Sequence, residues 1–352
     1  MIEDLALENF RNYEKAFFKF GPTTVIIGKN GVGKTSILEA ISMLSMTTSW
    51  KTEKDSEVVR WDQSFARVTS DLRELVIQVH PYLKRIKIDG VSKRTFQVIG
   101  LFPTTLFQPD DLQLIYGSPT MRRHYLDRVI SQTSTAYTEA IIELNQVLKQ
   151  RNRLLKNIQE GMAGRSELLF WNQELARLQQ IIQIPRQSFV DHLNRLVPRI
   201  FAEMINEGGA ISIAYLRSPK TDEHSFLQHL EQQADKEIMV GVSLYGPHRE
   251  DIALSWGEHL VQQSMSRGQT RSLLVAFKIA ELEYITQQSG IKPVLLLDDI
   301  FSELDAERRE RLFNVLGEYQ VIMTTTELGN LQGVLQPNTQ IIDLEKSDTI
   351  LQ

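Results

Sequence analysis

The chain has 352 residues, 42% of them apolar and 24% charged, which describes an ordinary globular protein and excludes disordered, fibrous or membrane-spanning classes. It has no cysteine, which excludes disulfides, thiolate metal sites and a cysteine nucleophile and fits a cytoplasmic location. The net charge of −5, taken alone, argues against a nucleic-acid partner.

The first hundred residues carry mostly strand patterns around one helix. Apolar and polar residues alternate as in half-buried strands, and the run Thr24–Ile27 leads into a glycine-rich turn and a helical pattern over Thr35–Met46. The alternating stretches are residues 2–10, 15–20, 65–68, 75–80, 85–89 and 91–96, the last two turning at Asp89-Gly90.

The next segment has the periodicity of long helices. Two heptad seams are separated by a glycine-containing turn at Glu160–Ser166, and Pro185 is expected to break or kink the second. The seams are Tyr137, Ile141, Leu144, Leu148, Arg151, Leu155, Ile158, Met162, and then Leu168, Trp171, Leu175, Leu178, Ile182, Phe189, Leu193, Leu196, Ile200. They predict an antiparallel helical hairpin; a compact helical bundle is the alternative.

Strands and helices alternate in the last part of the chain. We expect strands at 210–216, 240–245, 252–256, 293–297, 320–325 and 340–344, and helices at 222–236, 272–286 and 306–317. Strands at both ends of the chain favour an α/β domain assembled from both ends, with the helical hairpin inserted. The expected parts are residues 1–118, 119–205 and 206–352.

The charge is unevenly distributed over these parts. Residues 119–205 hold 12 basic and 8 acidic side chains, whereas residues 206–352 hold 12 and 22. Phosphate backbones respond to local clusters, so the pairs Lys84-Arg85 and Arg122-Arg123 are candidate DNA contacts. The alternative is that they are ordinary solvated faces.

The run Gly28-Lys29-Asn30-Gly31-Val32-Gly33-Lys34-Thr35 fits the phosphate-loop pattern G-x-x-x-x-G-K-[ST], between a strand and a helix. Its glycines let backbone amides wrap a phosphate at a helix N-terminus. Lys34 is expected to reach the β and γ phosphates, and the hydroxyl of Thr35 to ligate Mg²⁺. The sequence therefore predicts a site for ATP and Mg²⁺.

Two acids end the apolar strand Pro293–Leu297. In a phosphate-loop enzyme an acid in this place holds Mg²⁺, and the next one orients the attacking water. Asp298 is predicted to take the first role and Asp299 the second.

Two further motifs flank that strand. Ser266-Arg267-Gly268-Gln269 opens the long helix before it, and Ser302-Glu303-Leu304-Asp305 follows it. Alone, the first motif could be an ordinary helix N-cap. In this order the elements resemble ABC ATPases, whose nucleotide lies between the phosphate loop of one subunit and the serine-glycine-glutamine signature of the other.

The chain resembles the RecF family of recombination-repair proteins more specifically, over about residues 3 to 326. The resemblance rests on Leu7–Tyr13, Gly117–Arg123, Leu126-Asp127, Tyr245–Asp251 and Leu296–Asp305. It implies a DNA-binding ATPase that dimerises on ATP, hydrolyses it slowly with DNA stimulation, and acts with RecR and RecO at single-strand gaps to help RecA load.

Site residues follow from the resemblance. Gly28 to Ser36 match the nucleotide loop, Ser266, Gly268 and Gln269 the signature acting in trans, and Ser302 and Asp305 the loop that crosses the dimer interface. Gln108 matches a magnesium- and water-sensing glutamine, and Thr324 to Thr326 replace the switch histidine of transporters. Arg11 is either a nucleotide contact or a solvated side chain, and His248 and Arg249 are either functional or turn residues.

Three other interpretations share the ATPase core. A transporter subunit is disfavoured by the long segment between the phosphate loop and Ser266. An overcoming-lysogeny type nuclease would carry a further domain after the core, and a structural chromosome-linking protein would carry far longer coiled coils.

Overall fold

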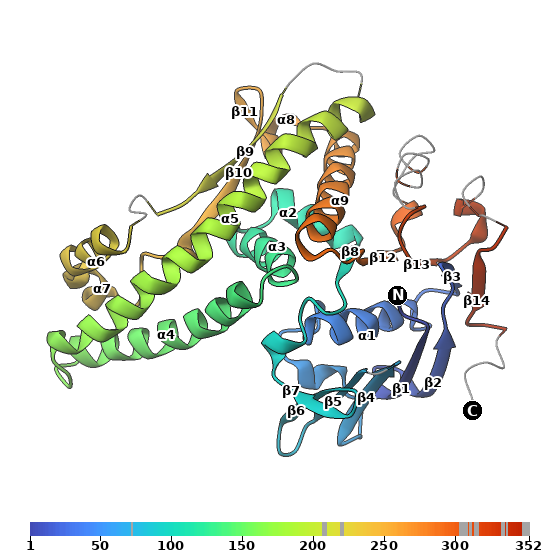
Figure 1. Ribbon diagram of the computed structural model, residues 1–352, viewed down its shortest axis with the longest axis horizontal. Helices are drawn as coiled ribbons and strands as arrows, with labels where there is room; N and C mark the ends of the chain where they lie inside the picture. Colours follow the sequence, from blue (N-terminus) through green and yellow to red (C-terminus); the bar gives the residue numbers. More distant parts are fainter. Residues whose placement is uncertain are drawn as a thin grey trace. The chain divides into compact units, whose positions relative to one another are not determined.

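The computed structural model describes residues 1–71, 73–205, 210–218, 222–302, 309, 312, 317–331, 335 and 337–346. The chain forms two compact units (Figure 1). The first, called here the ATPase unit, comprises Met1–Leu112 and Arg271–Gln352, and the second, the helical unit, comprises Gln113–Thr270. Among the described residues, no helix has both the length and the apolar stretch that a bilayer crossing would require.

A five-stranded parallel sheet in the order β14-β3-β13-β12-β8 forms one layer of the ATPase unit. Its strands come from both ends of the chain, as the sequence predicted. They are β3 (Thr23–Ile27), β8 (Thr104–Phe107), β12 (Val294–Asp298), β13 (Val321–Thr325) and β14 (Gln340–Asp343). Their apolar, β-branched sequences suit a sheet buried on both faces.

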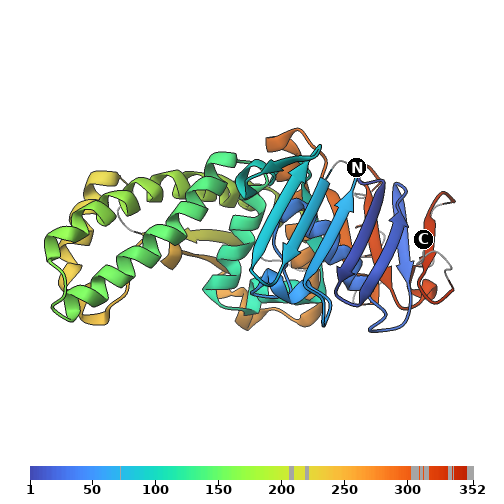
Figure 2. The same cartoon turned by 90° about the horizontal axis from the view of Figure 1, so that it is seen from below.

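A six-stranded antiparallel sheet in the order β2-β1-β4-β5-β6-β7 forms a second layer (Figure 2). Its strands are β1 (Asp4–Phe10), β2 (Tyr13–Lys19), β4 (Phe65–Ser70), β5 (Arg73–Gln78), β6 (Leu83–Ile88) and β7 (Val91–Lys93). The alternation seen in the sequence predicted these strands and the turn between β6 and β7, but the strand expected over 91–96 ends at Lys93 and is followed by a 3-10 turn at Thr95–Gln97. One face of each strand from β1 to β6 enters the core, whereas β7 is exposed, and the outer face carries paired charges such as Lys87 with Glu74.

Helix α1 (Lys34–Met46) lies between the two sheets of this unit (Figure 1). Its side chains from Ile37 to Leu44 are buried around the whole helix, and they form one core with residues of both sheets. A mostly apolar helix that is buried on every side is expected in such a central position. Short 3-10 turns complete the unit, at η1 (Asp55–Val58), η2 (Thr95–Gln97), η3 (Pro109–Leu112), η6 (Ile300–Ser302) and η7 (Leu328–Leu331).

The helical unit contains the predicted hairpin. Helices α4 (Thr135–Gln159) and α5 (Leu168–Met204) run antiparallel, joined by the predicted turn and by η4 (Arg165–Glu167). The unit also holds α2 (Gln113–Tyr116), α3 (Pro119–Ser131), β9 (Ile211–Leu216), α6 (Glu223–Gln232), α7 (Ala234–Val240), η5 (Pro247–Arg249), β10 (Asp251–Trp256), β11 (His259–Leu260) and α8 (Val261–Ser264). Helix α9 (Arg267–Ser289) begins in this unit and continues in the ATPase unit.

The structure differs from the sequence expectations in several elements. Helix α5 continues through Pro185, so this proline does not break the helix, and Ile182 and Phe189 on either side of it are fully buried. No strand forms at Val240–Tyr245, because the amides of Ser243 and Leu244 donate to side chains instead, to Asn152 Oδ1 at 2.8 Å and Glu237 Oε1 at 2.7 Å. Strand β8 and helix α3 were not predicted.

The compact units also divide the chain differently from the three expected parts. Residues 206–270 had been grouped with the ATPase lobe, but their described members belong to the helical unit. The reason is packing, since β9 and α6 both contact α5. The helix expected near 306–317 falls largely outside the described residues.

Candidate nucleotide-binding site

The predicted phosphate loop and acids meet at one edge of the parallel sheet. The loop joins β3 to α1, and Asp298 ends β12. Strand β13 lies between these two strands and pairs Thr324 with Asp298. The carboxyl ends of parallel strands open onto a common edge, which is where ligands bind in sheets of this kind.

The phosphate loop has the backbone that its glycines allow. Gly31 and Gly33 have φ values of 83° and 115°, which side chains other than glycine rarely adopt. A Cβ atom on Gly33 would also lie 2.6 Å from Nδ2 of Asn12 and 2.7 Å from the hydroxyl of Tyr13. Nδ2 of Asn12 donates to the carbonyl of Val32 at 2.9 Å, which holds the loop from a neighbouring strand connection.

Lys34 is buried at the start of α1, with 6% of its surface exposed. Its Nζ donates to the carbonyls of Gly28 at 2.6 Å and Lys29 at 3.0 Å, across the loop. Burial lowers the pKa of Lys34, and the carboxylates of Asp299, Asp298 and Glu345 oppose that shift. The ammonium group is thus held inside the loop, where a phosphate would offer it a stronger partner than carbonyls do.

The hydroxyl of Thr35 donates to Oδ1 of Asp298 at 3.0 Å, and the hydroxyl of Thr324 donates to the same oxygen at 2.8 Å. A hydroxyl and a carboxylate are suitable Mg²⁺ ligands, since Mg²⁺ takes one or two protein oxygens with phosphates and water. The described residues contain no group of three or more His, Asp or Glu side chains that could hold a metal without a nucleotide. The predicted pair Thr35 and Asp298 therefore fits Mg²⁺ brought with a nucleotide.

Asp299 lies beside this pair in a left-handed turn with a φ of 50°. Its amide donates to the hydroxyl of Thr324 at 3.0 Å, so Thr324 connects both predicted acids. Aspartate tolerates this conformation better than most residues. The turn places Asp299 in the wall of the same cavity as Asp298.

Gln108 follows β8 directly and is next in register to Asp298, because Phe107 pairs with Leu297. The backbone amide of Gln108 donates to Oδ2 of Asp111 at 3.0 Å. Its neighbour Pro109 lines the phosphate-loop cavity, whereas Gln108 lines a small apolar pocket with Leu112 and Leu274. The structure thus places Gln108 at the correct sheet edge but outside the cavity wall.

A cavity of about 630 Å³ surrounds the phosphate loop. Besides the predicted residues it is lined by side chains that the sequence did not point to, namely Asn12, Lys51, Glu57, Val59, Trp61 and Pro109. Trp61 stands out in the sequence only as an isolated tryptophan between Arg60 and Asp62, a polar turn that offers no core for it to enter.

Arg11 forms part of the same wall. Its guanidinium binds the fully buried Glu39 on α1 with two bonds, at 2.9 and 2.5 Å, and donates to the carbonyl of Glu57 at 2.9 Å. Arg11 therefore joins β1, α1 and η1 around the cavity, and is not an ordinary solvated side chain.

The signature residues lie in the helical unit and begin helix α9. Ser266 Oγ accepts from the amide of Gln269 at 3.3 Å, and Gln269 Oε1 accepts from the amide of Ser266 at 2.7 Å. This reciprocal capping box presents an exposed serine at a helix N-terminus, a favourable place for an anion. Asp305 and the side chain of Ser302, predicted for the crossing loop, lie outside the described residues.

The four predicted DNA contacts differ in how they are bound. Lys84 forms an ion pair with Asp55 at 2.8 Å, and Arg122 is buried with two bonds of 2.7 Å to Asp251. Arg123 donates to the carbonyl of Glu250 at 2.8 Å. Lys84 and Arg122 are thus neutralised by carboxylates of the protein itself. Arg85 on β6 is exposed, as a DNA contact would have to be.

The segment Tyr245–Asp251 is a clamped turn in the helical unit. His248 Nε2 lies 3.1 Å from the carbonyl of Ser243, and the guanidinium of Arg249 donates to the same oxygen at 2.9 and 3.1 Å. Of the two interpretations of His248 and Arg249, the turn role agrees with these contacts.

Three comparisons place these features among known proteins. Residues 1–345 match the RecF/RecN/SMC N terminal domain. The DNA replication and repair protein RecF of Moorella thermoacetica is 33% identical over 98% of this chain and 95% of its own. A solved structure of the recombination mediator protein RecF with ATP in the RecFOR pathway is 30% identical, with a TM-score of 0.86 over 95% of this chain and 93% of that chain.

A more distant structure shares the fold alone. An Smc head bound to the C-winged helix domain of ScpA is 16% identical, with a TM-score of 0.51 over 94% of this chain and 92% of that chain. Together these likenesses confirm the predicted α/β fold, an ABC-type ATPase head interrupted by a helical arm.

Proposed function

The chain belongs to the RecF branch of the RecF/RecN/SMC N-terminal domain family, and we propose that it binds ATP with Mg²⁺, dimerises on ATP and clamps DNA in that form. Slow, DNA-stimulated hydrolysis then resets the clamp. The observation that carries the proposal is the meeting of Thr35 and Asp298 at 3.0 Å beside the phosphate loop.

The chain's own groups divide the work as follows. Amides of Gly31 to Ser36 and the Nζ of Lys34 bind the phosphates, and the Thr35 hydroxyl and Asp298 hold the metal. Bound Mg²⁺ neutralises charge on the phosphates. Asp299, in the wall of the cavity, orients the attacking water. Thr324 keeps both acids in place through its hydroxyl.

The position of the signature supports the proposed dimerisation. Ser266, Gly268 and Gln269 belong to the helical unit, and Ser266 is exposed. We propose that the signature of one copy contacts the γ-phosphate held by the other. The hydroxyl of Ser266 and the N-terminal amides of α9 supply the donors that this contact needs.

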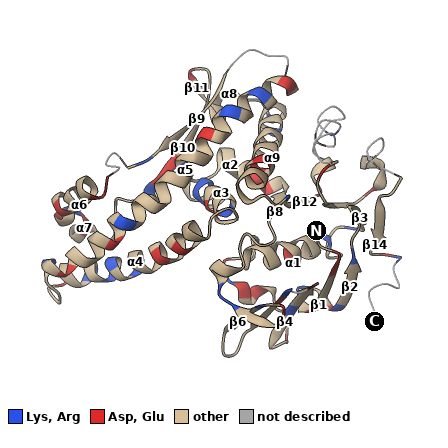
Figure 3. Cartoon of the chain, in the orientation of Figure 1, with Lys and Arg blue, Asp and Glu red and all other residues tan. Residues whose placement is uncertain are grey.

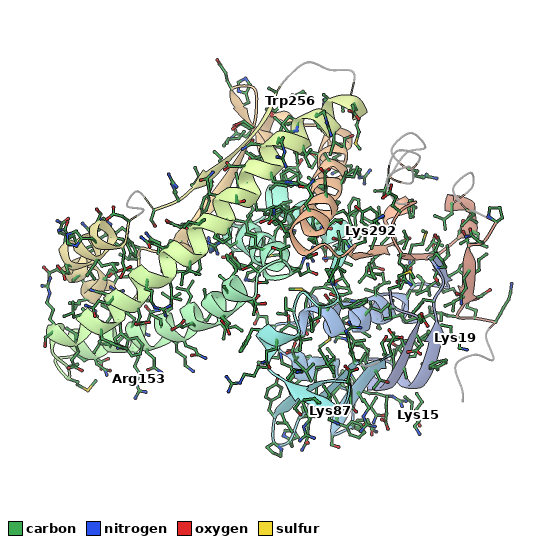
Figure 4. All side chains as sticks on the ribbon, in the orientation of Figure 1. Lys15, Lys19, Lys87, Arg153, Trp256 and Lys292 are labelled. Carbon is green, nitrogen blue, oxygen red and sulfur yellow. The ribbon has the colours of Figure 1, made fainter. Side chains whose placement is uncertain are left out.

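The DNA and protein partners extend the proposal. RecR, RecO and RecA-pathway proteins are the expected partners, at single-strand gaps and duplex junctions of DNA in the cytoplasm. Exposed basic residues on α4 support DNA contact by the helical arm. They are Lys149, Arg153 and Lys156, spaced four and three residues apart on one side of the helix, and Arg153 projects outward from α4 (Figure 4).

One experiment tests the proposal by following mass and DNA binding together. The protein is sized with MgATP and with MgADP, and its binding to fluorescent gapped duplex is measured at several salt concentrations. ATP should double the mass and tighten DNA binding, and the affinity should fall steeply with salt. The same mass in both nucleotides would contradict the sandwich, and salt-insensitive or absent DNA binding would contradict the clamp.

Two variants identify the groups responsible. Lys34→Ala should bind no nucleotide and remain monomeric, whereas Lys15→Ala, at an exposed lysine on β2 outside the cavity lining, serves as the control. Asp299→Asn should bind ATP and stay dimeric because hydrolysis is lost. Normal turnover in Asp299→Asn would assign the catalytic carboxylate elsewhere.

A further inference from the structure

Glu345 brings a carboxylate from late in the chain to the phosphate loop. Strand β14 lies beside β3 (Figure 1), and the amide of Leu344 donates to the carbonyl of Ile27 at 2.9 Å where the pairing ends. Glu345 comes next, and its Oε1 accepts a hydrogen bond from the amide of Lys29 at 2.9 Å, across 316 residues of sequence. Glu345 does not line the phosphate-loop cavity, so it is placed beside the loop and not against a ligand.

The turn that carries Glu345 is held at two points. The amide of Glu345 donates to Oδ1 of Asp343 at 3.0 Å, and Leu344 between them is 7% exposed. A Cβ atom on Gly28 would lie 3.5 Å from the Cβ of Leu344, which is an ordinary packing distance. The turn thus holds the backbone of Glu345 against the first residue of the phosphate loop.

One peptide group joins Glu345 to Lys34. In the peptide between Gly28 and Lys29, the N–H donates to Glu345 and the C=O accepts from the Nζ of Lys34 at 2.6 Å. Hydrogen bonds in such a chain polarise one another, so a carboxylate at the N–H makes the C=O a better acceptor. Glu345 thereby strengthens a bond that Lys34 must give up, or share, when it turns to a phosphate.

The charge of Glu345 acts in the same direction. Burial lowers the pKa of Lys34, and Glu345 is one of three carboxylates that oppose this shift, so its field reaches the ammonium group. The other two, Asp298 and Asp299, line the cavity beside the proposed metal site, where Mg²⁺ offsets their charge. Lys29 lies 3.4 Å from Glu345, but its side chain is 86% exposed, so water weakens the compensation that it provides. A phosphate in the loop is thus opposed by a carboxylate outside the metal site.

We propose that Glu345 lowers the affinity of the phosphate loop for nucleotides and speeds their release. It is a positioning residue, since it acts on Lys34 through a peptide group and through its charge and touches no ligand. The ADP that remains after hydrolysis then leaves the site without the help of a separate exchange factor. This inference rests on the proposed nucleotide site and concerns only how tightly that site holds a polyphosphate.

The test separates the charge of Glu345 from its hydrogen bond. Glu345→Gln keeps an oxygen for the Lys29 amide and removes the charge, whereas Glu345→Ala removes both. Affinities for ADP and for pyrophosphate, each with Mg²⁺, are measured by calorimetry at low and high salt, and release of a fluorescent ADP is measured by stopped flow. At low salt Glu345→Gln should bind both ligands about 2- to 5-fold tighter, the value of an exposed charge interaction, and release ADP correspondingly more slowly. The gain should shrink at high salt, and Glu345→Ala should bind ADP at least as tightly as the wild type.

A matched control removes a comparable charge elsewhere in the ATPase unit. Glu318 is 75% exposed and pairs with Lys292 at 2.8 Å, outside the cavity lining, and Glu318→Gln should leave ADP affinity unchanged. Unchanged or weaker ADP binding in Glu345→Gln overturns the inference, and weaker binding in both Glu345 variants would mean that the residue holds the loop in its binding shape. A gain of equal size at high salt would also overturn it, because that gain would not arise from charge. If the wild-type chain binds neither ligand, the proposed function itself fails and the inference falls with it.

Discussion

The two units contain buried cations in different surroundings. In the helical unit Arg186 donates to the Tyr137 hydroxyl at 2.9 Å, the Pro247 carbonyl at 2.8 Å and Asp127 at 2.8 Å, and it is 1% exposed. In the ATPase unit the Nζ of Lys34 donates to two carbonyls of its own loop, beside the carboxylates of Asp298 and Asp299. Arg186 finds its partners within the fold. The groups around Lys34, by contrast, can still bind a phosphate and a metal ion.

This difference changes how the charge of the sequence is interpreted. The basic segment 119–205 holds Arg122, Arg151 and Arg186, which are all buried and paired within the helical unit. Its excess of basic residues therefore overstates the charge on its surface. Figure 3 shows acidic and basic residues interspersed along α4 and α5, and the basic residues left on the surface include Lys149 and Arg153 of α4 and Arg195 of α5.

The largest expected effect tests whether the helical unit depends on its buried cation. Arg186→Met should lower the free energy of unfolding by about 3 to 5 kcal/mol, because it leaves Asp127 and Glu250 without their cation. Arg177→Met is the control, since Arg177 binds Glu143 and Glu174 at the surface and should cost about 0 to 1 kcal/mol. Urea unfolding followed by circular dichroism measures both. An equal loss of unfolding free energy in the two variants would show that burial of Arg186 does not make its ion pairs more important than those of Arg177.

The surroundings of Lys34 in the ATPase unit could be predicted from the sequence. The partners of the buried arginines in the helical unit could not. The phosphate loop and Asp298 were found because each is a local pattern, a strand followed by a loop or by an acid. The pair Arg122 and Asp251 is separated by 129 residues, and no local pattern reveals that one neutralises the other.

The same limit applies within the ATPase unit. Glu39, which holds Arg11, is 28 residues away from it, and the turn of Trp61 reaches the cavity only because it pairs with the end of β1. Val240–Tyr245 failed as a strand for a related reason, since Asn152, which is 91 residues away from Ser243, binds the amide of Ser243. Local periodicity describes elements well, but it does not show which partners the folded chain brings to them.

An effect of intermediate size is expected in the pH dependence of stability. It arises from His248, a histidine that the helical unit buries in its neutral form. Burial lowers the pKa of His248 to about 4, and its Nδ1 is buried with no hydrogen-bond partner among the described residues. Between pH 6.5 and 4 the unfolded chain takes up a proton that the folded chain refuses, so stability falls as the pH falls through this window. The loss approaches about 3 kcal/mol at pH 4.

Substitution should remove that dependence. His248→Gln, whose amide can still donate to the Ser243 carbonyl, should flatten the loss of stability between pH 6.5 and 4, whereas His259→Gln on the exposed strand β11 should not. Urea unfolding midpoints of the three proteins at pH 7, 6, 5 and 4.5 measure the difference. An unchanged slope in His248→Gln would assign the acid sensitivity to other groups and weaken the contrast between the units.

The smallest expected effect concerns Asn12 in the ATPase unit. There we expect a polar contact to support ligand binding more than the stability of the fold. Asn12 is exposed, and its Nδ2 donates to the carbonyl of Val32 in the phosphate loop at 2.9 Å. Asn12→Ala should weaken ADP binding about 2- to 10-fold, the value of one hydrogen bond, with little change in stability. Asn12→Asp should weaken it further, since an oxygen would then face the carbonyl. Asn145→Ala, exposed on α4, is the control, and calorimetry with thermal unfolding measures both quantities. If Asn12→Ala instead lowers stability and leaves ADP affinity intact, the loop is held for the fold, and the distinction between the two units disappears at this position.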